Sequence, residues 1–310
     1  MKQDPVHNDE SVNCLIELAL KEDIGTGDIT TEILIPPDLE TSAVFLSKTD
    51  GIVAGIDIAK KVFLKLDPQI KFTVNIKDGA VIKPGDNIAT VRGKARAILT
   101  GERVALNFLQ RLSGTATLTG QFVARVRDLP VRIIDTRKTT PGFRLLEKYA
   151  VRMGGGHNHR LNLGDGVLIK DNHLALLRAK GVSLKEAVTG ARRKTPKELK
   201  VEVETTNLDE VREAVAAGAD IIMFDNMSPE MMRQAVKLLK PGIKSEASGG
   251  VNLRNVRAIA ETGVNFISIG ALTHSAKALD ISLELQSQNQ SARRALTKKP
   301  SSVSSMIISV

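Results

Sequence analysis

The sequence contains very few cysteine and aromatic residues. Its 310 residues include one cysteine, Cys14, which excludes an intrachain disulfide framework and a cysteine-rich zinc module. With no tryptophan, one tyrosine and 3% aromatic residues, platforms for stacking nucleobases are scarce. No apolar run approaches the roughly 18 residues that a membrane-spanning helix needs. The polar start MKQDPVHNDE lacks the apolar centre of a secretory signal. We therefore expect a cytoplasmic protein without a membrane partner.

The chain carries a formal charge of +9 and a pI near 9.6, which raises the question of nucleic acid. No stretch resembles a helix-turn-helix, an RRM or a zinc finger, and a pocket for small anions explains the same charge more locally. We expect no nucleic-acid partner, with a basic RNA-binding protein as the competing interpretation. The proportions of 42% hydrophobic and 25% charged residues are globular, and the length suits one large or two ordinary domains.

The first part of the chain predicts a small α/β unit. A helix is expected around Val12–Leu20 and another over Ile58–Leu66. Alternating apolar residues in IKFTVNI and turns at Asp78-Gly79 and KPGD predict an antiparallel sheet. A further helix is expected over residues 101–112, with Thr100 as its N-cap, a break at Ser113-Gly114, and a second helix in TATLTGQFVARVRD.

After Pro130 the sequence alternates between short apolar runs and amphipathic stretches. The runs VRIIDTRK, GVLIKDN, LKVEVETT, DIIMFDN, IKSEASGG and FISIGAL each end in charged or glycine residues. Such alternation predicts a parallel sheet, and six units indicate a closed or nearly closed α/β barrel. Chemistry in such barrels occurs at the carboxyl ends of the strands, which here carry Thr136, Arg137, Lys138, Lys170, Glu204, Asp225, Glu246, Ser248 and Gly270.

The segment 134–173 concentrates basic residues on a glycine-interrupted backbone. It has seven Lys or Arg against four Asp or Glu, a net of 7 − 4 = +3, and this predicts an anion pocket. Its His157-Asn158-His159 motif could bind zinc in a hydrolase, but such a site needs further histidines from later strands. We favour a histidine that donates to a carboxylate, or a structural hydrogen bond.

Two glycine-rich turns, SGGVNLRN and IGALTHSAK, follow the last two expected strands. Glycine lets backbone N–H groups approach an anion closely, and barrels often bind phosphate at this position. The strand VEVE places Glu202 and Glu204 on one face, and Asp225 ends the next strand. These carboxylates could contact sugar hydroxyls or the water of a bound metal, although a solvated or ion-paired role is equally compatible with the pattern. For Arg103, a solvated helix charge is the ordinary interpretation.

The blocks DTRKTTPGFRLLEKYAVRMGGGHNHRLNLGDGVLIKDNH, GERVALNFLQRLSGTAT, KVEVETT, FDNMSPE, EASGGVN and SIGALTHSAKALD together resemble the quinolinate phosphoribosyltransferase family over residues 12–284. The resemblance implies an α/β protein with an N-terminal α/β sandwich domain (1–115) and an incomplete, open C-terminal α/β barrel (116–285). Residues 286–310, Ser/Gln-rich and basic, would be a disordered tail. It also implies a homo-oligomer, a dimer or a hexamer, in which one subunit covers the active site of another.

The implied reaction joins quinolinate to 5-phosphoribosyl-1-pyrophosphate with Mg²⁺, giving nicotinate mononucleotide, CO₂ and pyrophosphate in de novo NAD synthesis. The resemblance assigns the quinolinate carboxylates to Arg137, His159 and Arg160 with Arg103 from a partner subunit. Thr136, Lys138 and Lys170 would line the same pocket. Glu204, preferred to Glu202 because it lies nearer the strand end, and Asp225 would approach the ribose and the magnesium-bound pyrophosphate. The 5′-phosphate would bind Ser248, Gly249, Gly250 and Gly270. The alternative is a phosphoribosyltransferase for another pyridine carboxylate, such as nicotinate.

Overall fold

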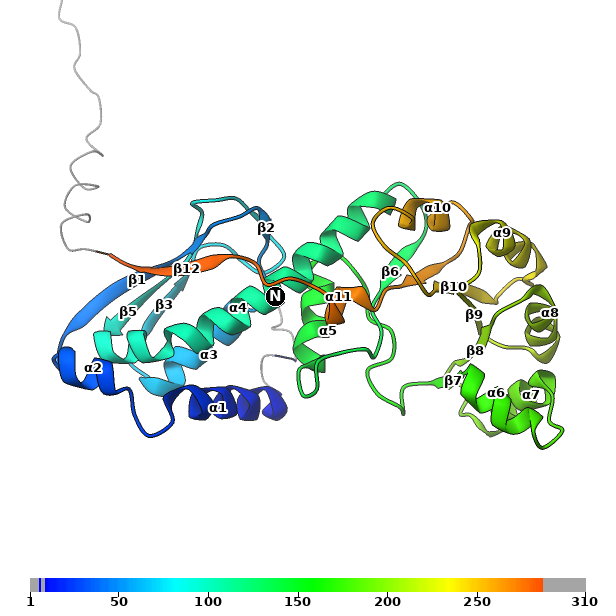
Figure 1. Cartoon of the computed structure of the whole chain (residues 1–310), viewed down its shortest axis with the longest axis horizontal. Coiled ribbons are helices and arrows are strands. Elements are labelled where there is room, and N and C mark those ends of the chain that lie inside the picture. The colour runs from blue at the N-terminus through cyan, green and yellow to red at the C-terminus, as the bar shows by residue number, and fades with distance from the viewer. Residues whose placement is uncertain (1–5, 7–8, 287–310) are drawn as a thin grey trace, which may run out of the picture.

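The computed structural model describes residue 6 and residues 9–286. It shows two large sheets joined by one long helix (Figure 1), and a third sheet that consists of the two short strands β2 (Gly51–Ile52) and β4 (Val81–Ile82). The predicted tail lies outside the described residues, apart from Gln286. The first unit contains α1 (Glu10–Ile24), α2 (Ile29–Leu34), β1 (Glu40–Ser47), β2 (Gly51–Ile52), α3 (Ile56–Leu66), β3 (Lys71–Val74), β4 (Val81–Ile82), β5 (Asn87–Lys94) and α4 (Ala95–Val126).

A four-stranded antiparallel sheet in the order β12-β1-β5-β3 forms the first unit. Helix α3 packs its apolar side on the core, burying Ala59, Val62 and Phe63. Phe63 meets Phe45 of β1 edge-on, with ring centroids 6.1 Å apart, a geometry that aromatic rings favour. The antiparallel sheet predicted from alternation is therefore present.

Strand β12 (Ile281–Leu285) was not foreseen in this sheet. It pairs with β1, placing Phe45 opposite Leu283, although the sequence assigned residues 116–285 to the barrel unit. In Figure 1 the chain runs back from the barrel, along α4, to reach the first sheet. The last strand thus ties the end of the chain to its beginning, a long-range pairing that local pattern does not encode.

The predicted break at Ser113-Gly114 is wrong, since α4 continues through it as one helix of 32 residues. It begins after Lys94, so the expected cap Thr100 lies inside the helix, where its hydroxyl donates to Asp28 at 2.9 Å. Gly114 serves close packing instead: a Cβ there would collide with the carbonyl of Lys277. The Ser113 hydroxyl accepts from the backbone of Ala54 at 3.0 Å. Tertiary contact therefore explains both residues.

The second unit is a six-stranded parallel sheet in the order β6-β11-β10-β9-β8-β7. Its strands are the six predicted runs, and helices separate most of them. The elements are β6 (Arg132–Ile134), α5 (Arg144–Met153), β7 (Val167–Ile169), α6 (Asp171–Arg178), α7 (Leu184–Lys194), β8 (Val201–Thr205), α8 (Leu208–Ala217), β9 (Ile221–Asp225), α9 (Pro229–Leu238), β10 (Lys244–Ser248), α10 (Val256–Ala260), β11 (Phe266–Ser268) and α11 (Ala271–His274).

Local sequence explains where several of these helices begin and end. Asn207 caps α8 by accepting from two backbone N–H groups, and Gly218, in the left-handed region at φ +77°, ends the helix. Ser228 caps α9, and Pro229 occupies its first position. Each of these two helices therefore starts directly after the loop that follows a strand.

The barrel is open between its edge strands β6 and β7. Residues 157–160 lie beside β6, where His157 forms a parallel bridge to Ile134 and donates its N–H to Ile133 at 2.9 Å. This segment carries His159 and Arg160 into the barrel, so the opening contributes to the site. Among the described residues, no helix is both long and apolar enough to cross a membrane.

Candidate active site

A cavity of about 590 Å³ lies at the carboxyl ends of the barrel strands. All the predicted site residues except Arg103 and Gly270 line it. The lining residues are Asp135, Thr136, Arg137, Lys138, His159, Arg160, Leu168, Lys170, Glu204, Met223, Asp225, Asn226, Glu246, Ser248, Gly249, Gly250 and Ser268. Residues far apart in the sequence meet because parallel strands bring their carboxyl ends to one side of the sheet.

Arg137 and Arg160 form the cationic side of the cavity. The Nε atom of each guanidinium is buried without an acceptor among the described residues, and Arg160 donates Nη1 to the carbonyl of Gly166 at 3.0 Å. Burial lowers the pKa of Arg160, and the charge of Arg137 lowers it further, against the opposing effect of Glu202. Two half-buried guanidinium groups, each with a buried Nε donor that has no acceptor among the described residues, therefore face the cavity, and a bound anion would stabilise them.

A buried ionic network holds the segment that carries His159. Asp135 accepts from the backbone N–H of His159 at 2.8 Å and from the Asn158 side chain at 2.6 Å. It also pairs with Lys148, which the sequence grouped with the basic residues of the anion pocket. Lys148 is instead buried on α5 and does not itself line the cavity. Burial raises the pKa of Asp135 and lowers that of Lys148, while their mutual attraction opposes both shifts.

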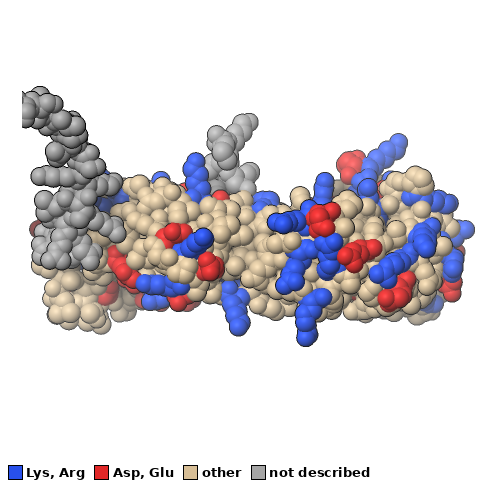
Figure 2. Space-filling model, turned by 90° about the horizontal axis from the view of Figure 1, so that it is seen from above, with Lys and Arg blue, Asp and Glu red and all other residues tan. Residues whose placement is uncertain are grey.

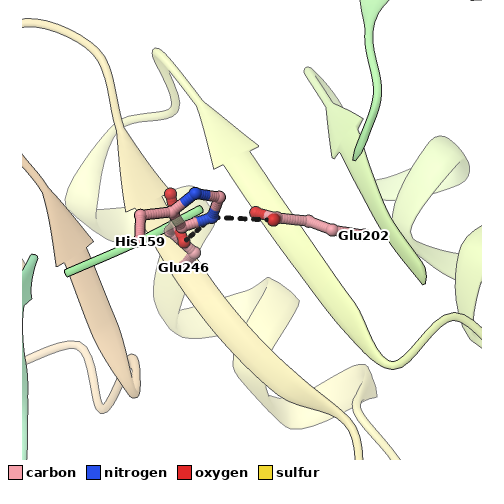
Figure 3. Close-up of side chains that lie close together, drawn as sticks. All are labelled: His159, Glu202 and Glu246. Atoms are coloured by element: carbon pink, nitrogen blue, oxygen red, sulfur yellow. Dashed lines mark hydrogen bonds and ion pairs between the residues drawn. The ribbon is translucent and has the colours of Figure 1, made fainter. Parts of the chain in front are cut away.

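His159 points its Nε2 atom at two buried carboxyl groups, Glu202 of β8 and Glu246 of β10 (Figure 3). The distances are 2.9 Å to Glu202 Oε2 and 3.5 Å to Glu246 Oε2. Glu202 and Glu204 share a strand face as predicted, but at different depths: Glu204 lines the cavity, whereas Glu202 lies beneath His159. The structure thus separates two carboxylates that the sequence left as alternatives.

Glu204 and Asp225 form the acidic side of the cavity. Glu204 Oε2 accepts from the backbone N–H of Asp171 at 3.3 Å, and its Oε1 lies 3.9 Å from the Lys170 ammonium. Burial is the largest cause that raises the pKa of Glu204, and the charges of Asp225 and Asp171 raise it further. These carboxyl oxygens can accept hydrogen bonds from hydroxyl groups in the cavity.

The turn after β10 is shaped by its neighbour Asn226. Asn226 has φ 54°, the left-handed region, and donates its N–H to Ser248 at 2.9 Å. Gly249 has φ +90°, and a Cβ there would collide with the Asn226 side chain. Gly250 has φ +61° with no atom within 4 Å of a built Cβ. Ser248, Gly249 and Gly250 all line the cavity, and the backbone at Gly250 is open.

Gly270 and Arg103 lie outside the cavity lining. Gly270 is next to it, since a Cβ there would be 3.1 Å from Lys138 Cδ. The Lys138 loop is held by Thr273, whose hydroxyl donates to the carbonyl of Lys138 at 2.7 Å. Arg103 is exposed on α4, so within this chain its position is that of a solvated helix charge.

The described histidines do not gather as a zinc hydrolase would require. His157 is exposed and bridges to β6 through its backbone. The ring of His173 accepts from the backbone of Lys170 at 3.0 Å, and His274 pairs with Ser275 at 2.6 Å. His159 is left with carboxyl groups alone. Sequence reasoning overlooked Asp135 and Asn226 as parts of the site, although both follow strands, because only the structure shows what they hold.

This geometry, an open α/β barrel with a polar cavity at its strand ends, is that of an α/β-barrel enzyme, whose site lies at the carboxyl ends of the strands. Residues 28–113 match the N-terminal domain of quinolinate phosphoribosyl transferase, and residues 115–284 match its C-terminal domain. The chain belongs to the quinolinate phosphoribosyltransferase family, and the resemblance found in the sequence is confirmed.

Two curated relatives are named probable nicotinate-nucleotide pyrophosphorylase [carboxylating]. The protein of Bacillus subtilis is 48% identical, covering 87% of this chain and 92% of its own. The protein of Synechocystis is 46% identical, and the match covers 86% of this chain and 90% of the Synechocystis protein. The structure of the nicotinate-nucleotide pyrophosphorylase from Francisella tularensis is 43% identical, with a TM-score of 0.83, and covers 89% of this chain and 96% of that one. The predicted fold class is likewise confirmed.

Proposed function

We propose that this chain transfers the phosphoribosyl group of 5-phosphoribosyl-1-pyrophosphate to quinolinate with decarboxylation, producing nicotinate mononucleotide, CO₂ and pyrophosphate in de novo NAD synthesis. The observation that carries the proposal is the pair Arg137 and Arg160, whose buried Nε atoms have no acceptor among the described residues. Quinolinate carries two adjacent carboxylates, and a guanidinium binds a carboxylate through two parallel hydrogen bonds. A dianion therefore fits this side of the cavity better than a monoanion.

In this proposal Arg137, His159 and Arg160 hold the two carboxylates, and Thr136, Lys138 and Lys170 complete the basic pocket. Once the ring nitrogen is ribosylated, its positive charge stabilises the electron pair left on the adjacent ring carbon when the bond to the carboxylate breaks and CO₂ leaves. This carbon then takes up a proton, which gives nicotinate mononucleotide. The protein mainly positions the reactants and offsets the charge on the leaving pyrophosphate. The catalytic roles fall to Arg137, Lys138, Lys170, Glu204 and Asp225.

The ribose 5-phosphate part of 5-phosphoribosyl-1-pyrophosphate would occupy the opposite side of the cavity from the two arginines. Ser248, Gly249, Gly250 and Gly270 are proposed for the 5′-phosphate, because the positive φ angles of Gly249 and Gly250 expose backbone donors. Glu204 and Asp225 would accept from the ribose hydroxyls. Mg²⁺ would arrive on the pyrophosphate and offset its charge, and the oxygen-rich rim formed by these two carboxylates suits the water molecules around such a hard cation.

We also propose a homo-oligomer, a dimer or a hexamer, in which Arg103 of the partner subunit completes the quinolinate pocket. Two observations support this. Arg103 is exposed and does not reach the cavity of its own chain. Large apolar side chains on α1 and α2 are also exposed: Leu18 by 64%, Ile33 by 75% and Leu34 by 69%. Exposed apolar groups of this size are typical of surfaces that a partner covers.

The predicted absence of a nucleic-acid partner and the cytoplasmic location stay predictions. Lys and Arg side chains alternate with Asp and Glu on the barrel half of the face in Figure 2. This mixture of charges favours a role for the excess positive charge in a local anion pocket over one continuous basic surface for nucleic acid. A mobility-shift assay at physiological salt tests the RNA-binding alternative.

The deciding experiment measures pyrophosphate and CO₂ release with quinolinate and with nicotinate in parallel. Quinolinate-dependent release of both products is expected, with little turnover of nicotinate, whose single carboxylate cannot use both guanidinium groups. Faster turnover of nicotinate would instead support the alternative pyridine-carboxylate transferase.

A further inference from the structure

Two buried carboxyl groups, Glu202 and Glu246, lie beneath His159, and several of their oxygens have no hydrogen-bond partner among the described residues. Glu246 is 1% exposed, and neither of its oxygens has a hydrogen-bond partner among the described residues; His159 Nε2 lies 3.5 Å from Oε2. Glu202 is 3% exposed, and its Oε1 is likewise unpaired. The ring nitrogen of His159 and one oxygen of each carboxyl group all lie within 4.8 Å of one another.

Two carboxylates cannot both be ionised in such a position at low cost, because burial and mutual repulsion disfavour the second charge. Burial is the largest cause that raises the pKa of Glu246 well above its usual value, and the charge of Glu202 is the next. Ser268 on β11 opposes this shift and Glu204 on β8 adds to it. Arg160, from the loop before β7, interacts favourably with Glu202. A pair that shares one proton, and so carries a single negative charge, avoids most of this cost.

The two members of the pair have different relationships to His159. Glu202 lies at a direct hydrogen-bond distance of 2.9 Å from Nε2, whereas Glu246 is at 3.5 Å. Glu202 is consequently the better acceptor for the Nε2 proton. The other ring nitrogen, Nδ1, has no protein partner within the part of the chain that the structure describes.

We propose that Glu202 and Glu246 share one proton and act as positioning residues for His159, fixing Nε2 as the inward donor so that Nδ1, when it carries a proton, donates to a carboxylate of the substrate. This inference rests on the proposed function, because it concerns the orientation of a quinolinate-binding side chain. It adds two residues that neither the motif nor the resemblance assigned. The distances indicate that Glu202 has the larger effect on His159, because it accepts the Nε2 hydrogen bond directly, whereas Glu246 acts by sharing a proton with Glu202.

Glutamine substitutions separate the two roles, because glutamine imitates a protonated carboxyl group but cannot carry its charge. Glu202→Gln is expected to raise the KM for quinolinate by about tenfold or more, the scale of a lost charge-assisted hydrogen bond. Its pH profile of kcat/KM should also change, while the KM for 5-phosphoribosyl-1-pyrophosphate stays near that of the unmodified protein. Glu246→Gln should raise the quinolinate KM less, whereas Glu246→Leu, which cannot share a proton, should approach Glu202→Gln.

Glu213→Gln, on the exposed side of α8, is the matched control, and thermal unfolding of every variant checks that the fold is intact. Equal effects of Glu202→Gln and Glu246→Gln, or an unchanged quinolinate KM and pH profile in Glu202→Gln, would overturn the inference. So would a stoichiometric divalent cation in the purified protein that both glutamine variants lose, since the three groups would then form a metal site. If the unmodified protein fails to turn over quinolinate, the proposed function falls and this inference with it. If the unmodified protein turns over quinolinate normally but Glu246→Gln raises the quinolinate KM as much as Glu202→Gln or more, only this inference is disproved and the proposed function stands.

Discussion

Lys148 and Asp135 form an ion pair at 2.5 Å in which the two side chains are 2% and 0% exposed. The pair is directly linked to the candidate active site, because the same carboxyl group accepts from the backbone of His159. One interaction therefore connects the packing of α5 with the position of His159, which lines the cavity. A buried charge deprived of its partner is costly, so this connection has measurable consequences.

Lys148→Met is expected to destabilise the protein by about 3–5 kcal/mol, because it leaves Asp135 buried without its cation. Quinolinate binding should weaken as well, since the segment at His159 loses its anchor. Chemical unfolding gives the first quantity and calorimetric titration the second. Lys237→Met, on the exposed side of α9, should change neither. Unaltered stability of Lys148→Met would refute the structural role of the pair.

Gly249→Ala is expected to weaken binding of 5-phosphoribosyl-1-pyrophosphate strongly, because the new Cβ would collide with Asn226 at a positive φ angle. Gly250→Ala should be milder, since it carries backbone strain of about 1–2 kcal/mol but meets no atom within 4 Å. The double variant Gly249→Ala/Asn226→Gly removes the collision, and glycine tolerates the backbone angle of Asn226. Partial recovery of the substrate KM is expected, and no recovery would show that the steric explanation is wrong.

Arg137→Ala should lower kcat/KM for quinolinate by roughly 10- to 100-fold, the effect of losing about 1.5–3 kcal/mol of charge-assisted hydrogen bonding. Catalysis and quinolinate binding should decline together, because the same guanidinium positions and binds the substrate. Steady-state kinetics with each substrate varied in turn measure this. Arg212→Ala on exposed α8 provides the control. Kinetics of Arg137→Ala matching those of the unmodified protein would eliminate the assignment of this residue.

Arg103→Ala should also inactivate the protein, although this arginine does not line the cavity of its own chain. If sites are shared between subunits, mixing it with Arg137→Ala should restore part of the activity, because mixed oligomers contain some sites with both arginines. Subunit exchange is verified with differently tagged chains. Failure to recover activity despite proven exchange contradicts the shared site.

Asp28 contributes a pH-dependent part of the stability of the first unit. Hydrogen bonds from the Thr31 side chain, then from its backbone, lower the pKa of Asp28 below its ordinary value of 3.8. The stabilisation is therefore complete above pH 3.8 and is lost as the pH falls through the lower, folded-state pKa. Asp28→Ala should cost about 1 kcal/mol at neutral pH, and the difference should shrink in acid. Denaturant unfolding across this pH range tests it, with Asp38→Ala as an exposed comparison.

Much of the barrel was predictable because its pattern is local. Most of the strands are short apolar runs with charged or glycine residues at or soon after their ends, and the helices carry one apolar side with caps such as Asn207 and Ser228. Periodicity and capping depend on neighbours in the sequence, so they can be identified without coordinates. The same reasoning failed at Ser113-Gly114, where glycine usually indicates a break. There the helix continues because close packing against Lys277 compensates for the intrinsic cost of glycine.

The sequence by itself determined the α/β class, the six barrel strands and the family, because these follow from residue patterns and ordered motifs. Only the tertiary structure decided that β12 pairs with β1, that Lys148 leaves the anion pocket for a buried pair, and that Glu202 lies beneath His159 while Glu204 faces the cavity. These contacts join residues that are far apart in the sequence, and they form only where folding buries the residues together, away from water. Burial determines their hydrogen bonds and charges, and burial is a property of the folded chain.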